Sequence, residues 1–183
     1  MLDSPVFVVT TQVDGHPSGC LVSFATQASV QPPRFLVGME RTSDTCAVAS
    51  RSSHLVVHVL SQRHRGLAEL FDGQNTDRID KFARCTWRAG PQGMPILDDA
   101  LAWFVGKTVD RIDFGDHVGY LLEPAGVWAP ESYEDLLYLS DIDDLDDPGH
   151  PDQEVPQPAR SAEREPVDTT RRYGLVRFTL DRF

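Results

Sequence analysis

The sequence has few cysteines, and those it has form no recognisable pattern. Cys20, Cys46 and Cys85 are an odd number at unrelated spacings, whereas a disulfide framework needs an even set. Free thiols are typical of a reducing compartment. No run approaches the roughly 20 apolar residues that a membrane-spanning helix requires, and the N-terminal segment lacks the basic region and cleavage site of an export signal. We therefore expect a cytoplasmic protein with no membrane segment.

An excess of positive charge is also missing, and with it the usual means of binding nucleic acid. The net charge is −11, but it is unevenly distributed. Between Glu131 and Asp168 thirteen acidic residues accompany two arginines, so this segment alone carries −11 and the remainder is neutral. Neither part has the basic stripe that contacts phosphates along a nucleic acid. We expect no nucleic-acid partner.

Several motifs that carry nucleotide or nucleophile chemistry are absent. There is no Gly-x-Gly-x-x-Gly and no P-loop lysine motif, nor a Cys-x-x-Cys or a Gly-x-Ser-x-Gly. His54 and His58 share one face of a predicted strand, but the sequence shows no third ligand for a metal ion. We expect no metal site, and any nucleotide must bind on a scaffold other than a Rossmann or P-loop fold.

Short β-branched runs separated by turn residues dominate the first 130 residues. They predict strands at 5–12, 19–24, 35–39, 54–60, 100–112 and 118–122. Ser43 and Ser61 are each placed to cap a short helix, and Asp14-Gly15 and residues 114–116 are placed to make tight turns. This pattern predicts a mainly-β fold, a β-barrel with short peripheral helices.

The composition changes after Pro130. Residues 133–145 mix Leu and Tyr with acids and predict one more strand or turn, whereas 148–166 holds five prolines among charges and almost no large apolar residue. The second of these segments should be disordered, because it has too little apolar surface to offset the entropy of ordering. We predict one domain over 1–147, an acidic Pro-rich disordered segment over 148–170 and a strand-like segment over 171–183.

Three polar segments are candidates for chemistry on this scaffold. The segment 19–29 interleaves hydroxyls and an amide with small residues, which suits a planar polar ring. The segment 40–45 ends where Ser43 begins a helix, and a helix N-terminus next to an arginine suits an anion. His117 follows a turn and can orient a substrate ring. Alone, the segment 19–29 is more typical of a polar strand and loop, and a single histidine is more often structural. The segment 40–45 is equally typical of a plain helix cap.

Taken in order, these segments resemble the flavin reductase-like family, the FMN-binding split barrels that serve two-component monooxygenases. The resemblance rests on seven motifs over residues 5–127: Pro5-Val6-Phe7-Val8-Val9-Thr10-Thr11, 19–29 with Pro32-Pro33, Arg41-x-Ser43-x-Thr45, 55–60, Asp80-Lys81-Phe82, Gly90-x-x-Gly93-x-Pro95-Ile96-Leu97, and Gly115-Asp116-His117 followed by Glu123. No single motif is specific to the family, but seven in the same order are.

The resemblance implies a split-barrel homodimer that binds FMN, or FAD, at its interface and transfers hydride from NAD(P)H to flavin N5. It implies that His117 is the catalytic residue that meets the nicotinamide. The residues implied to bind the cofactor are Ser23, Phe24, Ala25, Thr26, Gln27 and Ser29 at the flavin and Arg41, Ser43 and Thr45 at its phosphate. The implied partner is a flavin-dependent monooxygenase that receives the reduced flavin.

The stretch from Leu21 to Gln27 departs from the family's polar pattern, with Phe24 and Ala25 among the changed residues. Two alternatives therefore stay open beside the reductase. One is a flavin-binding protein of the same fold without reductase turnover. The other is a non-enzymatic, dimeric interaction protein.

Overall fold

The computed structural model describes residues 3–72, 79–131 and 135–143, which belong to one compact unit within Met1–Leu145. The disordered segment and the terminal strand predicted beyond residue 147 lie outside the described residues.

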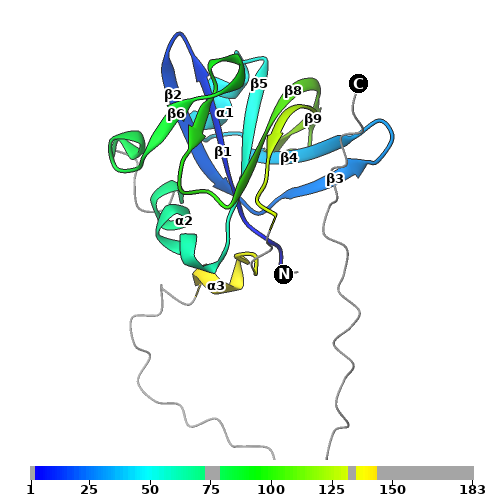
Figure 1. Ribbon diagram of the computed structural model, residues 1–183. Coiled ribbons are helices and arrows are strands. Elements are labelled where there is room, and N and C mark those ends of the chain that lie inside the picture. Colours follow the sequence, from blue (N-terminus) through cyan, green and yellow to red (C-terminus); the bar gives the residue numbers. More distant parts are fainter. Residues whose placement is uncertain (1–2, 73–78, 132–134, 144–183) are drawn as a thin grey trace, which may run out of the picture. The chain divides into compact units, whose positions relative to one another are not determined.

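Strands dominate the described residues and the helices are short, as predicted (Figure 1). The elements are β1 (Phe7–Val13), β2 (His16–Val22), β3 (Ala25–Ser29), β4 (Arg34–Glu40), α1 (Asp44–Ala49), β5 (His54–Val59), α2 (Arg65–Phe71), β6 (Trp87–Ala89), β7 (Pro95–Leu97), β8 (Ala102–Asp113), β9 (His117–Trp128) and α3 (Ser140–Asp143). Single 3₁₀ turns lie at Gln62–His64, Lys81–Ala83 and Pro91–Gly93.

Seven strands form one antiparallel sheet in the order β2-β1-β5-β8-β9-β4-β3. The edge strands are therefore β2 and β3, yet only Ser23 and Phe24 separate them in the chain. Because the chain passes from one edge of the sheet to the other within two residues, the sheet must curl until its edges approach each other. Where the sheet closes on itself, β2 faces β4 without pairing with it, and we call this gap the seam. The predicted mainly-β split barrel with short peripheral helices is confirmed.

Two predicted turns set the hairpins that build this sheet. Asp14 and Gly15 both have positive φ, 53° and 78°, as the type I′ turn between β1 and β2 requires. At the other hairpin Gly115 has a φ of 93°, and the N–H of Phe114 donates to the carbonyl of His117 at 3.0 Å. Both turns are confirmed, and the second places His117 at the start of β9.

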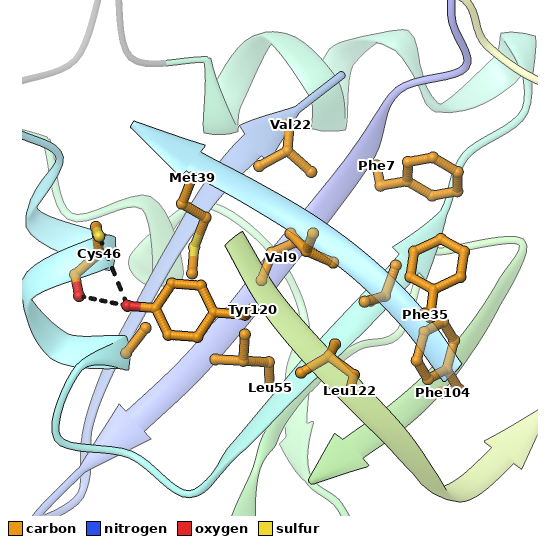
Figure 2. Close-up of a cluster of buried hydrophobic side chains, with 13 residues drawn as sticks. Phe7, Val9, Val22, Phe35, Met39, Cys46, Leu55, Phe104, Tyr120 and Leu122 are labelled. Carbon is orange, nitrogen blue, oxygen red and sulfur yellow. Dashed lines mark hydrogen bonds between the residues drawn. The ribbon is translucent and has the colours of Figure 1, made fainter. Parts of the chain in front are cut away.

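The interior of the barrel is filled by apolar side chains from the curled sheet and α1 (Figure 2). The Phe35 ring packs edge to face between Phe7 and Phe104, with centroid distances of 6.0 and 5.2 Å. Tyr120 lies fully buried, and its hydroxyl donates to the carbonyl of Cys46 at 3.3 Å. The polar tip of the largest buried ring is therefore satisfied, as a buried hydroxyl requires.

A second cluster packs the outer helices against the barrel. It includes Val6, Val8, Phe71, Leu137 and Ile142, from β1 and the residue before it, α2, and the last described segment. The strand or turn predicted over 133–145 takes the form, in its described part, of isolated bridges at Leu136 and Tyr138 followed by α3. These residues cover the outer side of β1.

Candidate functional site

An open groove with a volume of about 980 Å³ lies at the seam. One wall comes from β2 and the two residues that follow it. The other comes from Gly38 and Glu40 of β4, from Thr42 and Ser43, and from the first residues of α1. The remainder comes from Asp72, residues 79–82 and His117 at the start of β9. Because β2 and β4 are not paired in the sheet, no ladder of hydrogen bonds seals the space between them. We call this cavity the seam groove.

Hydroxyl groups are the commonest polar groups of the seam groove: Ser18, Ser23, Thr42, Ser43 and Thr45. The hydroxyls of Ser18 and Thr45 lie 3.0 Å apart and connect β2 to α1 across the seam. Ser43 is the N-cap of α1, as predicted: its Oγ accepts from the N–H of Cys46 at 3.2 Å and donates to the carbonyl of Glu40 at 2.8 Å. These uncharged groups suit a ligand rich in oxygen atoms.

Lys81 supplies positive charge to the seam groove and is the only Lys or Arg among its lining residues in the described chain. Its Nζ donates to the carbonyl of Phe71 at 3.2 Å and lies 5.8 Å from the centroid of that ring. An ammonium has three donors, so others are left for a ligand. The neighbouring Asp80 accepts from the amides of Phe82 and Ala83. Lys81 belongs to one of the seven motifs, but the sequence analysis did not single it out as a site residue.

The Cys20 thiol also lines the seam groove, where burial raises its pKa to about 12 despite a hydrogen bond with Thr45. A thiolate, not a thiol, is the reactive form of cysteine. Burial therefore favours the neutral thiol of Cys20, which forms part of the wall of the seam groove.

His117 is held in place by its neighbours at the start of β9. It pairs with Glu40 in the β4–β9 ladder, and its Nδ1 lies 2.9 Å from Oδ1 of Asp116. This hydrogen bond, and the positive charge that the ring carries when protonated, lower the pKa of the Asp116 carboxyl. An ionised carboxylate can only accept, so Nδ1 donates and Nε2 is left to interact with a ligand.

The structure brings half of the predicted site residues together in the seam groove: Ser23, Phe24, Ser43, Thr45 and His117. Arg41 does not line it. Its guanidinium lies 2.5 Å from Oδ1 of Asp113 and donates to the carbonyl of Gly115 at 2.9 Å, at the tip of the β8–β9 hairpin.

The other predicted residues, Ala25, Thr26, Gln27 and Ser29, belong to the edge strand β3 and also lie outside the groove lining. In β3 they pair with β4, and Gln27 donates to the carbonyl of Ser29 at 3.3 Å. Contacts of Arg41 and of the β3 residues with a cofactor remain predictions.

The fold and the groove define a β-barrel protein with an open, hydroxyl-lined groove at its seam, a site whose chemistry suits a polar organic ligand. The chain belongs to the flavin reductase like domain family, whose model matches residues 1–142. The family predicted from the sequence is confirmed.

Named relatives and solved structures agree with this assignment. The chain is 34% identical over 137 residues to the FMN reductase (NADH) RutF of Methylorubrum extorquens, covering 75% of this chain and 66% of that protein. It is 29% identical to the 4-hydroxyphenylacetate 3-monooxygenase reductase component of Pseudomonas aeruginosa, covering 76% and 82%. The crystal structure of a flavin reductase domain protein from Arthrobacter sp. FB24 superposes with a TM-score of 0.65 at 27% identity, covering 74% and 86%.

None of the described helices is both long and apolar enough to cross a membrane. In the same part of the chain, no three His, Cys, Asp or Glu side chains are grouped so that they could bind a metal ion.

Proposed function

We propose that the protein is an NAD(P)H-dependent flavin reductase that binds FMN, or FAD, in the seam groove. One observation carries the proposal: in a chain of the flavin reductase family, residues expected to bind flavin (Ser23, Ser43 and Thr45) line the same groove as His117, the residue expected to meet the nicotinamide. The relatives named FMN reductase (NADH) support FMN as the cofactor and NADH as the reductant.

The chemistry of the seam groove fits a flavin nucleotide. The hydroxyls of Ser18, Ser43 and Thr45 match a ribityl chain and phosphate oxygens, and Lys81 supplies a cation for the phosphate. The carboxylate of Glu40, which also lines the groove, is held by the hydroxyl of Thr42 at 2.6 Å. A bound flavin supplies the ring that accepts hydride, while the side chains bind and orient the two nucleotides.

His117 then acts on the nicotinamide side. The Asp116 carboxylate holds its ring through Nδ1, so Nε2 is oriented for the carboxamide of the substrate. Keeping the two rings face to face lowers the entropic part of the barrier to transfer, and no acid–base pair is required of the protein.

The protein would be a cytoplasmic homodimer with the flavin between its protomers, and it would supply reduced flavin to a flavin-dependent monooxygenase. The similarity to a monooxygenase reductase component supports such a partner. Sedimentation of the flavin-loaded protein tests the dimer, and product formation by an added oxygenase tests the transfer.

The decisive experiment is a titration with FMN followed by NADH or NADPH. We expect quenching of FMN fluorescence on binding and loss of nicotinamide absorbance on turnover. Folded protein that neither quenches FMN nor consumes the nicotinamide above background contradicts the proposal. Binding without turnover favours a flavin-binding protein that is not a reductase.

A further inference from the structure

Two glycines that face each other on β4 and β9 form a floor beneath two phenylalanine rings. Gly38 and Gly119 are partners in the β4–β9 ladder. A Cβ on Gly38 would come within 2.2 Å of the Phe24 ring, and one on Gly119 within 2.4 Å of the Phe114 ring. The two rings lie 5.6 Å apart between centroids. The absence of both Cβ atoms is therefore what lets an aromatic pair lie directly on the sheet.

Of these two rings, Phe24 lines the seam groove and Phe114 does not. Phe24 is 45% exposed and Phe114 is 41% exposed, so both keep much of an apolar ring in contact with solvent. The backbone of Phe24 is fixed to the floor, because its carbonyl accepts from the N–H of Gly38 at 2.7 Å. The ring is thus held at the groove by a short, well-defined attachment.

Phe24 also lies beside the residue expected to meet the substrate. Its ring centroid is 6.1 Å from that of His117, with the ring planes at 77°. Together they offer a flat apolar surface next to a polar edge. A nicotinamide has the matching parts, a planar ring for stacking and a carboxamide for hydrogen bonding.

We propose that Phe24, which the family resemblance places at the flavin, is instead a substrate-positioning residue whose ring stacks on the nicotinamide ring while His117 meets its carboxamide, an inference that rests on the proposed function. The oxidised nicotinamide ring is a cation, and cations are attracted to the face of an aromatic ring. Phe24 therefore contributes more to the binding of NAD⁺ than to that of NADH. A purely structural role for Phe24 gives no such difference.

The test compares two matched pairs of variants, F24L with F114L and G38A with G119A. We expect F24L to raise the KM for NADH about tenfold, the effect of losing one stacked base, with kcat and FMN affinity unchanged. The dissociation constant of NAD⁺, measured by calorimetry on the FMN-loaded protein, should rise more than the KM. F114L should leave all these values unchanged, and F24W should restore them.

The variants G38A and G119A provide an independent check, because each displaces a phenylalanine ring without removing it. G38A should displace Phe24 and reproduce F24L, whereas G119A should displace only Phe114 and leave NADH use intact. If G38A does not fold, the comparison of F24L with F114L alone tests the proposal.

Equal effects of F24L and F114L on the KM for NADH overturn the proposal, and so does a loss of FMN affinity in F24L. A change in the sedimenting mass of the F24L variant also overturns it, because Phe24 would then be an interface residue. A wild-type protein that binds FMN and NAD⁺ but does not oxidise NADH contradicts the reductase, while calorimetry with F24L still tests the stacking.

Discussion

His58 accepts at Nε2 a hydrogen bond from the backbone N–H of Leu97, 3.0 Å away. Since Nε2 accepts, Nδ1 carries the proton and donates to the carbonyl of Val8, also at 3.0 Å. One fully buried ring thus joins β5 to β1 and β7 and satisfies two backbone groups. Both ring nitrogens of His58 are therefore used in hydrogen bonds to the backbone.

The first prediction concerns stability against acid. Burial lowers the pKa of His58 from 6.5 to about 4, so the unfolded chain binds this proton more readily than the folded one. The stability that the neutral ring contributes is present above pH 6.5 and is lost as the pH falls towards 4, by about 3 kcal/mol in all. Urea unfolding across this range should show the loss. His58→Asn, which cannot titrate, should show a shallower dependence, and equal slopes for both proteins contradict the assignment.

The second prediction concerns Arg111, which secures α1 to β8. Its Nη2 donates to the carbonyls of Ala49 and Ser52, at 3.3 and 3.2 Å, and its guanidinium lies 5.5 Å from the centroid of Tyr120. Arg111→Met should lower the free energy of unfolding by about 1–2 kcal/mol. Arg51→Met, an exposed control, should change it by less than about 0.5 kcal/mol. Similar losses in both variants would show that the contacts of Arg111 contribute nothing specific.

The third prediction tests Lys81 as the cation for the flavin phosphate. Lys81→Gln should weaken FMN binding about tenfold or more, because a charge-assisted hydrogen bond contributes about 1.5–3 kcal/mol. Riboflavin, which lacks the phosphate, should bind the variant and the wild type equally. Lys107→Gln, outside the groove lining, serves as the control. A parallel loss of riboflavin affinity would mean that Lys81 supports the groove without contacting phosphate.

The fourth prediction separates the two sides of the site. His117→Ala should raise the KM for NADH and leave flavin affinity nearly intact. Asp116→Asn should have a smaller effect in the same direction, since it weakens the hydrogen bond that orients His117. Steady-state kinetics and FMN titration give both quantities. If His117→Ala abolished flavin binding while turnover per bound flavin stayed normal, His117 would belong to the flavin side instead.

Local patterns made most of the barrel predictable from the sequence. β1 and β5 are runs of Val with regular burial, and the Asp14-Gly15 pair demands a particular hairpin turn. The sequence does not predict β3 as a separate strand, because its residues alternate between half-exposed and exposed and so show no apolar pattern. β6 and β7 have three residues each, too few for any periodicity to be read.

The site was less predictable than the fold, because its walls depend on how the sheet closes. Ser43 carries a local signal as a helix cap, and His117 follows a recognisable turn. Arg41 sits in the same short motif as Ser43, yet its side chain is held by Asp113, 72 residues further along the chain. Lys81 reaches the groove by lying over Phe71. Such distant pairings leave no trace in residue spacing.

The seam has a consequence for how this protein can change. β2 and β4 face each other across the groove without sharing a ladder, so the barrel's strand pairing does not depend on the side chains that line the gap. Ser23 and Phe24 lie between β2 and β3, so their side chains can be exchanged without disturbing a strand ladder. Other lining residues serve both the groove and the fold, because Val22 is buried in the barrel core and a Cβ on Gly19 would come within 2.7 Å of the Phe71 ring. Ligand preference can therefore change with little effect on folding stability at Ser23 and Phe24. Random mutagenesis of these two positions should yield folded variants with altered nucleotide selectivity more often than mutagenesis of β5.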